Sequence, residues 1–341
     1  MNRWLLFVLS LVSLGGCTSE AAVPDIGQVV ASSSDETAER DAIYAQVKAA
    51  IASDDFAALS AMEEDFRSSR ARTPSGTWKL AAYHAALQAD LAEGIGPSFG
   101  CTYKKADFVK RWAAAEPRNP APFITDAAML LQQAWCIRGP GMADEVAPDA
   151  WPRFRAGIDA AFTLLQKHRG MASVDPEYYT VLVYMLGSQG GEKGLMRNLL
   201  DEATAREPDY HRTYFKAVWF HMPQWGGSYA EVEQFARYAA ERSRRAEGDG
   251  MYARVFWSLA ECECDIVTQI ADRTLLKQAM ADVFQRYPAH WNGRYFADLS
   301  CQLGDREEGR RYLKAINPGA TDEASMAALY AACDAMRRGA G

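Results

Sequence analysis

Apolar residues recur at helical spacing along most of the chain that follows residue 34. In the segment 35–52, Ile43, Val47 and Ile51 fall on one face of a helix with about 3.6 residues per turn. Runs that alternate apolar and polar residues, which would predict β-strands, are scarce, and alanine is abundant. The pattern therefore predicts an all-α fold, whose first helices cover 35–52, 56–66 and 78–91.

Capping signals divide the rest of the chain into helices of roughly 10 to 20 residues. Ser228 followed by Glu231 fits a capping box, and Asn119 and Asp175 each precede a proline that suits a first helical turn. Acidic residues after Thr321 start the last predicted helix. Breaks are predicted at 94–98, 139–141, Gly170, Gly187, 226–227 and 304–305.

One segment near the end of the chain has the pattern of a packed helix pair. Helices are predicted over 291–303 and 307–316, joined by a Gly-Asp turn, with Ala297 and Gly309 as small residues at their contact. This unit resembles a tetratricopeptide repeat. The resemblance implies antiparallel helix pairs stacked as an α-α superhelix. Related proline-containing helix ends at Pro117, Pro208 and Pro288 are unequally spaced, so the array is irregular.

The order of several motifs carries a second resemblance. Gln133-Ala134-Trp135-Cys136-Ile137-Arg138-Gly139 is followed much later by Met222-Pro223-Gln224-Trp225-Gly226-Gly227-Ser228. This order is similar to that of the bacterial family described as domain of unknown function 4034, over about residues 75–320. That family is functionally uncharacterised, so the resemblance implies a helical fold and no catalytic residues.

The first residues have the pattern of an export signal. A positive start that includes Arg3 precedes an apolar stretch over 4–14, which is shorter than the roughly 20 residues of a membrane-spanning helix. Leu14-Gly15-Gly16-Cys17 then resembles the lipobox of bacterial lipoprotein signals. The resemblance implies a signal peptide over 1–16 and lipidation of Cys17. The alternative is an ordinary secretory signal that ends near a chance cysteine.

Several expectations about location follow from a lipidated Cys17. Residues 17–34 are polar and small, as in a flexible tether. Thr18, rather than aspartate, follows the cysteine, which favours the outer membrane with the protein facing the periplasm. Beyond the tether we expect N-terminal helices over 35–96 and a tetratricopeptide-like domain over 97–341.

An exported protein meets an oxidising compartment, where structural disulfides form. Six cysteines remain besides Cys17, and their 15 possible pairings are not distinguished by the sequence. We expect Cys101 and Cys136 to pair and close a helical hairpin. A second bridge is expected between the Cys262/Cys264 region and either Cys301 or Cys333.

Composition and motifs limit the possible functions. The chain has 341 residues with 49% hydrophobic and 24% charged residues, which excludes collagen-like, wholly disordered and multi-span membrane proteins. Its net charge of −7, without a basic block, argues against nucleic acid as the main partner. The glycine-rich stretch 187–194 lacks the Gly-Lys-Ser/Thr of a phosphate loop. The histidines of the chain form no His-Glu-x-x-His pair, which is a common zinc-binding motif. We therefore expect no cofactor and no metal.

Aromatic residues are dense between 178 and 238. Their helical spacing places some of these aromatic residues in the core. The remaining aromatic residues are expected to line a groove for a peptide or a partner helix. The sequence therefore favours a non-catalytic envelope lipoprotein that acts as a helical-repeat scaffold for an envelope protein or peptide. The alternatives are an envelope hydrolase acting on glycan or peptide, and a small-ligand binding protein. The candidate partner-binding residues are Tyr210, Tyr214, Trp219, Trp225 and Tyr229.

Overall fold

The computed structural model describes residues 26, 29, 31, 32, 35–260, 264–317, 327 and 331. Helices account for most of these residues, and the described part contains no named strand. The first nine elements are α1 (Glu36–Ala52), α2 (Phe56–Ser69), α3 (Lys79–Leu91), the 3₁₀ helix η1 (Pro97–Phe99), α4 (Ala106–Ala115), α5 (Ala121–Arg138), α6 (Ala150–Lys167), α7 (Arg169–Ala172) and α8 (Glu177–Ser188).

The chain continues as further helices joined by short loops. They are α9 (Lys193–Arg206), α10 (His211–Val218), the 3₁₀ helices η2 (Trp219–His221) and η3 (Pro223–Trp225), α11 (Tyr229–Glu247), α12 (Gly250–Ala260), α13 (Cys264–Ile270), α14 (Arg273–Arg286), α15 (His290–Gln302) and α16 (Arg306–Ile316). The expected all-α superhelix of packed helix pairs is confirmed.

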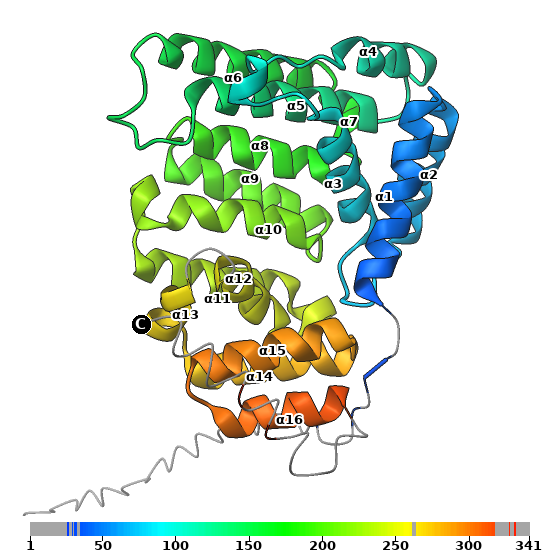
Figure 1. Cartoon of the computed structure of the whole chain (residues 1–341). Helices are drawn as coiled ribbons and strands as arrows, with labels where there is room; N and C mark the ends of the chain where they lie inside the picture. Colours follow the sequence, from blue (N-terminus) through cyan, green and yellow to red (C-terminus); the bar gives the residue numbers. More distant parts are fainter. Residues whose placement is uncertain are drawn as a thin grey trace, which may run out of the picture.

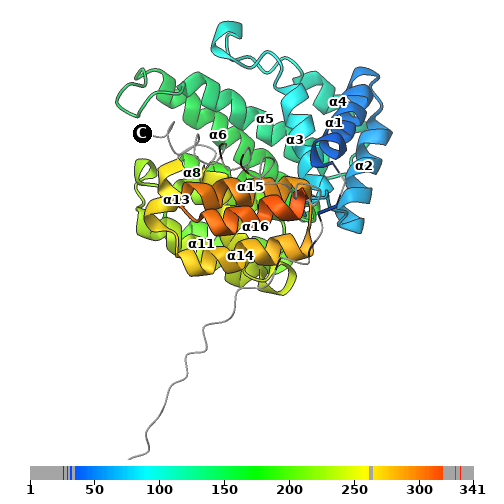
Figure 2. The same ribbon diagram turned by 60° about the horizontal axis from the view of Figure 1, so that its bottom comes forward.

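The helices from α5 to α16 are stacked in successive layers, and α1 and α2 run along one side of the stack (Figure 1). From the α16 end, α1 to α4 are grouped on that same side (Figure 2). Helices α5, α8, α10, α12 and α15 follow one another through the stack, and we call them the inner row because the N-terminal helices pack against it. Their partners α6, α9, α11, α14 and α16 form the outer row.

The last pair, α15 and α16, has the close contact that the sequence predicts. A Cβ atom placed on Gly309 would lie 3.1 Å from Sγ of Cys301 and 3.4 Å from the carbonyl oxygen of Ala297. Small residues are therefore needed where these two helices meet.

Most of the predicted helix starts are confirmed by capping contacts. Oγ of Ser228 accepts a hydrogen bond from the backbone N–H of Glu231 at 3.2 Å, and Oδ1 of Asp175 accepts one from Glu177 N–H at 2.8 Å. The break predicted at Gly170 is wrong, because Gly170 lies within α7 and the chain turns at His168 instead. A glycine weakens a helix by about 1 kcal/mol without ending it. The helix expected after Thr321 falls outside the described residues.

Two hydrophobic clusters form the core, and they do not divide at residue 96. One cluster extends from Ile43 to Tyr210, so the N-terminal helices share their core with α4 to α8. The other contains residues of α8 to α16 together with Ile26, which is fully buried. The segment expected to be a tether therefore contributes a core side chain.

Backbone contacts hold this N-terminal segment on the last helices. Ala31 N–H donates to the carbonyl of Ala315 at 3.3 Å, and Ser32 N–H donates to that of Pro288 at 2.5 Å. The signal over 1–16 and Cys17 lie outside the described residues. Among the helices that are described, none combines the length and the apolar character needed to cross a bilayer.

Cysteine pairing agrees with the sequence where side chains are described. Cys101 and Cys136 are joined by a disulfide, with their Cα atoms 5.5 Å apart. The bridge ties the loop after η1 to the last turn of α5. Cys301 is also disulfide-bonded. Its partner is outside the side chains that the structure describes.

Candidate functional site

Two of the five candidate tyrosine and tryptophan residues are core residues. Tyr210 is 1% exposed and Tyr214 is fully buried. Their hydroxyls donate to Oε2 of Glu177 at 2.9 Å and to the carbonyl of Pro208 at 2.8 Å. A buried tyrosine is stable when its hydroxyl has such a partner. The expectation that Tyr210 and Tyr214 line a surface groove is therefore wrong.

The other three candidates lie nearer the surface. Trp225 is 37% exposed and Tyr229 is 39% exposed, whereas Trp219 is partly buried against the core. Trp225 packs edge-on against Trp135, with ring centroids 5.7 Å apart, and against Phe220 at 5.3 Å. The structure therefore brings Trp225 to the surface beside aromatic residues that the sequence did not single out.

The motif around Trp225 builds a tight turn between α10 and α11. Gly226 has φ +78°, in the left-handed region that favours glycine. A Cβ atom on Gly227 would lie 2.0 Å from the carbonyl oxygen of His221, so only glycine fits there. Ser228 then caps α11. The motif fixes the turn that holds Trp225 in place.

A pocket of about 640 Å³, which we call the loop pocket, lies beside this turn. Lys193 binds Oε1 of Glu231 at 2.6 Å across it, and Nδ1 of His221 lies 4.0 Å from Oε2 of the same carboxylate. Burial lowers the pKa of His221, which keeps its ring neutral. The lining contains no serine, threonine or cysteine.

Four aromatic rings separate the loop pocket from a second pocket. Trp135 and Tyr184 stack with centroids 5.9 Å apart and planes 3° apart, and Tyr184 lies 6.1 Å from Phe220. Nε1 of Trp135 donates to Oγ of Ser188 at 3.0 Å, which fixes the indole. Together with Trp225 these rings form a rigid wall.

The second pocket, which we call the inner pocket, lies between α3 and the inner row. Its volume is about 320 Å³, within the size range of small-ligand sites. It combines two aromatic rings with amide, hydroxyl and charged groups. The lining residues are Gln88, Ala128, Leu131, Gln132, Trp135, Glu177, Thr180, Val181, Tyr184, Arg212 and Lys216.

The charged side chains of the inner pocket differ in how many hydrogen-bond partners they have. Oε1 of Glu177 accepts from Nε of Arg212 at 2.9 Å and from Nε2 of Gln88 at 3.1 Å, while Tyr210 donates to Oε2. Nη2 of Arg212 donates to Oε1 of Gln88 at 2.7 Å. Glu177 is therefore already satisfied by neighbours.

An apolar groove, the outer groove, lies on the opposite side between α6 and α9. It has a volume of about 420 Å³. Two of its apolar side chains are well exposed, Phe162 at 48% and Leu195 at 54%. Polar and charged side chains, among them Asp159, Arg169 and Glu202, also line it.

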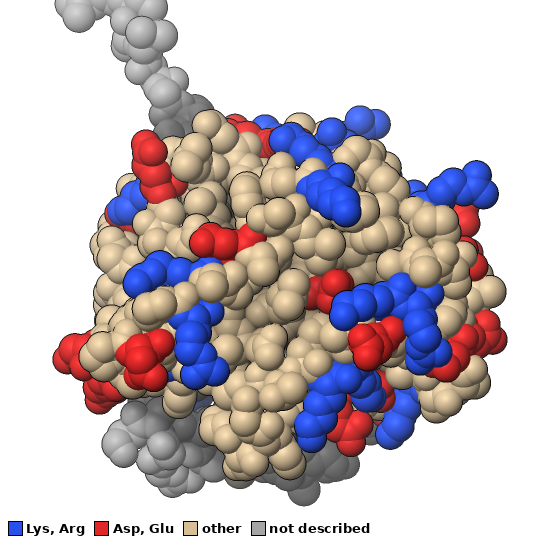
Figure 3. Space-filling view, turned by 90° about the horizontal axis from the view of Figure 1, so that it is seen from above, with Lys and Arg blue, Asp and Glu red and all other residues tan. Residues whose placement is uncertain are grey.

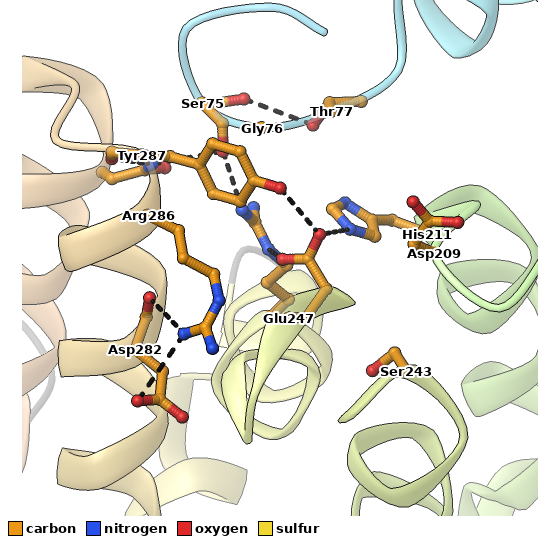
Figure 4. A network of polar contacts seen from close by, with 12 residues as sticks. Ser75, Gly76, Thr77, Asp209, His211, Ser243, Glu247, Asp282, Arg286 and Tyr287 are labelled. Carbon is orange, nitrogen blue, oxygen red and sulfur yellow. Dashed lines mark hydrogen bonds and ion pairs between the residues drawn. The ribbon is translucent and has the colours of Figure 1, made fainter. Parts of the chain in front are cut away.

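A buried polar network joins the α2–α3 loop to the inner row (Figure 4). At its centre is Glu247, which is fully buried. Its Oε1 lies 3.2 Å from Nη1 of Arg72 and 3.1 Å from Nε2 of His211, and it accepts from the hydroxyl of Tyr287 at 3.1 Å. Arg254 lies 3.6 Å from Oε2. Arg72 also pairs with Asp209.

The electrostatics of this network favour the ionised acid. Burial alone would raise the pKa of Glu247, but His211, Arg254 and Arg72 hold that pKa well below its ordinary value. Burial lowers the pKa of His211, whose Nε2 lies 3.1 Å from Oε1 of the carboxylate. The network is a structural link between distant parts of the chain.

A second buried acid–histidine pair lies at the α3–α8 contact. Nε2 of His84 lies 2.7 Å from Oδ2 of Asp175, with both side chains almost fully buried. Neither His84–Asp175 nor His211–Glu247 lines any of the three pockets described above. Both pairs are therefore out of reach of a substrate in those pockets. Among the described residues, no group of three or more His, Cys, Asp or Glu could hold a metal ion.

A Gly-x-Ser-x-Gly motif, which a serine hydrolase uses as its nucleophile elbow, was not expected in this chain, but Gly96-Pro97-Ser98-Phe99-Gly100 has that spacing. An elbow needs a strand before the serine and a helix after it. Here the serine lies in η1, between α3 and α4, and its side chain is exposed. The geometry is that of a surface loop.

Charges of both signs are interspersed on the face seen from the α6 end of the stack (Figure 3). Lysine and arginine side chains lie around a largely uncharged centre, next to aspartate and glutamate. On this face no broad field of one sign is present.

Comparisons with protein-family models, with curated proteins and with solved structures give no match to this chain. The resemblance to domain of unknown function 4034 therefore stays a proposal carried by the sequence motifs alone.

Proposed function

We propose that this protein is a non-catalytic scaffold of the bacterial envelope whose inner row binds a short segment of a protein partner. The single observation that carries the proposal is the way the inner row holds a non-helical part of its own chain. Nη2 of Arg254 and Nδ2 of Asn292 both donate to the carbonyl oxygen of Ser75, at 2.7 and 3.2 Å. Side chains on α12 and α15 thus bind a main-chain group.

The loop over residues 70–78 that is bound in this way reaches only one end of the inner row. Further along, α5, α8 and α10 present the inner pocket, which has the same kinds of donors in Gln132, Arg212 and Lys216. Trp135 and Tyr184 add flat apolar walls for a side chain. Hydrogen bonds to the main chain of a peptide, combined with pockets for its side chains, are a recurring basis of peptide recognition.

Peptide selection tests this proposal. Random 12-residue peptides are selected on the full-length chain purified in detergent, and affinities are measured by fluorescence anisotropy. Gln132 is exposed in the inner pocket, so Gln132→Trp fills the pocket without entering the core. We expect selected peptides to lose at least about tenfold in affinity for this variant.

The matched control uses the outer groove. Gln166 is also exposed, on the neighbouring helix α6, and lines that groove. Gln166→Trp is expected to bind the selected peptides as the unmodified chain does. Failure to enrich any peptide, or equal affinity for both variants, contradicts a scaffold that works through the inner row.

The location of the scaffold is a separate part of the proposal. Lipidation of Cys17 would anchor the chain to the membrane, since each buried methylene of an acyl chain contributes about 0.8 kcal/mol. We expect Cys17→Ser to move the protein from the membrane fraction to the soluble fraction. A variant that still sediments with outer membranes refutes lipid anchoring.

A further inference from the structure

The ammonium group of Lys216 is the unpaired charge of the inner pocket. Nζ lies 4.7 Å from the centroid of the Tyr184 ring, a cation–π contact. No hydrogen bond or ion pair joins Lys216 to any residue that the structure describes. The ammonium group thus contacts an aromatic face, while the nearby acid Glu177 forms its ion pair with Arg212.

Arg212 leaves a second donor group available beside it. Its contacts with Glu177 and Gln88 are made through Nε and Nη2. Nη1 makes no hydrogen bond with a described residue. Glu177 is the one acid among the described lining residues and attracts both Arg212 and Lys216, so the lining carries one positive charge more than it carries negative charges.

We propose that the inner pocket binds a carboxylate group of the partner's peptide, with Lys216 and Nη1 of Arg212 as its ionic partners. This inference rests on the proposed function and names the chemistry of that same site. The carboxylate belongs either to the end of the peptide or to an aspartate or glutamate side chain.

The size and walls of the pocket fit such a group. Its 320 Å³ corresponds to the volume of about ten water molecules, enough for a carboxylate and the residue that carries it. The stacked rings of Trp135 and Tyr184 shield the ion pair from water on one side. Charge-assisted hydrogen bonds are stronger in such partly enclosed sites than in bulk water.

The cost of leaving Lys216 unpaired supports the same conclusion. Burial, helped by the nearby guanidinium of Arg212, lowers the pKa of Lys216. A bound carboxylate offsets this cost and brings the pKa of the lysine back up. The site is therefore built to gain an anion.

Three short acetylated dipeptides test the proposal by calorimetric titration of the full-length chain. They are acetyl-alanyl-alanine with a free carboxylate, its amide, and acetyl-glutamyl-alanine amide, which carries its carboxylate on the side chain. We expect one or both acids to bind and the neutral amide to bind at least about tenfold more weakly. The acid that binds shows whether the pocket recognises the carboxylate of a chain terminus or that of a side chain.

Variants assign the effect to Lys216. Lys216→Met is expected to weaken the acids about 10- to 100-fold and Lys216→Arg to retain most of the affinity. Lys193→Met, which removes a lysine from the loop pocket, is expected to leave binding unchanged. Equal binding of acid and amide, or unchanged acid binding to Lys216→Met, overturns the carboxylate assignment.

The two proposals fail in different ways. If selected 12-residue peptides bind but do so equally on Lys216→Met and without any carboxylate, the scaffold stands and the carboxylate site falls. If no selected peptide binds while the small acids do, the scaffold falls and the pocket is a small-carboxylate site. Binding of inorganic phosphate in place of all three probes also overturns the assignment.

Discussion

Lys216 of α10 lies over the ring of Tyr184 of α8, with Nζ 4.7 Å from the ring centroid and no acid paired with it among the described residues. The two side chains come from adjacent helices of the inner row, so their contact is fixed by the stacking of the helices. A partly buried charge without a hydrogen-bonded counter-ion costs free energy in the unliganded protein. Lys216 is therefore expected to contribute to ligand binding without adding to the stability of the free protein.

Replacing Lys216 with methionine should not destabilise the free protein. Methionine keeps an apolar contact with Tyr184 and removes the buried charge. Because the folded-state pKa of Lys216 is lowered, the folded protein loses this proton at a lower pH than the unfolded chain. Its unfavourable contribution is therefore full below the folded-state pKa and fades as the pH rises from there toward 10.5.

Thermal unfolding at pH 7 measures this effect. We expect the midpoint of Lys216→Met to equal or exceed that of the unmodified chain. A drop of several degrees would mean that Lys216 stabilises the fold and would weaken its assignment as a ligand group.

Glu247 should be essential for stability because two arginines depend on it. Glu247→Gln removes a buried carboxylate that pairs with Arg72 and Arg254. We expect this loss to lower the unfolding free energy by about 3–5 kcal/mol. The pKa of Glu247 is held below its ordinary value of 4.5, so its stabilising effect is present above pH 4.5 and is lost as the pH falls below it. Urea unfolding measures both effects.

Glu241, which is exposed on the same helix, gives the matched control. Glu241→Gln is expected to change the unfolding free energy by less than about 0.5 kcal/mol. Equal effects at the two positions would show that the buried network contributes little.

Glu63 should make the protein more stable in mild acid. Burial and the nearby Asp175 raise its pKa to about 7, from an ordinary value of 4.5. The folded state therefore binds this proton more tightly, and the unfolding free energy falls as the pH rises from 4.5 to 7. Glu63→Gln keeps an acceptor for Arg67 and should raise stability at pH 8 by up to about 3 kcal/mol.

Comparison of pH 8 with pH 5 makes this test specific. At pH 5 the unmodified acid is protonated in the folded state, so the benefit of glutamine should shrink. Glu64→Gln, at the exposed neighbouring position, should show no pH-dependent gain. The prediction fails if Glu63→Gln gains as much at pH 5 as at pH 8.

Adjacent glycines in the turn after Trp225 should respond very differently to alanine. A Cβ atom on Gly227 would meet backbone atoms of His221 at 2.0 and 2.4 Å, so Gly227→Ala must move the turn and should cost about 3 kcal/mol. Gly226 has open space around it and only its φ of +78° opposes a side chain. Gly226→Ala should cost about 1 kcal/mol. Similar losses in urea unfolding would contradict the crowded geometry at Gly227.

The sequence predicts the helices well because their signals are local. Ser228 and Asp175 cap the helices that they were expected to cap, and Ala297 and Gly309 meet where small residues were expected. Each of these signals involves residues close in sequence or one helix pair. Ile26 differs, because an isolated apolar residue in a polar segment gives no sign of its burial.

The candidate site was less predictable because it depends on distant residues. Tyr210 and Tyr214 have the same local pattern as surface aromatics, and only tertiary packing buries them. Arg72 and Glu247 lie 175 residues apart in the chain, so no spacing rule links them. Lys216 becomes a candidate binding residue only when the fold places it in one pocket with Tyr184, Trp135 and Gln88. Its lack of an acidic partner is a property of the fold.

The most direct test of the proposed function is the position of a bound peptide. A selected peptide carrying a photoreactive diazirine is bound to the full-length chain and irradiated, and the cross-linked residues are identified by mass spectrometry. We predict cross-links on inner-pocket residues of α5, α8 and α10, such as Gln132 and Lys216, and their loss in Gln132→Trp. Cross-links confined to Phe162 and Leu195 in the outer groove, or to Trp225 and Tyr229, would contradict binding at the inner row.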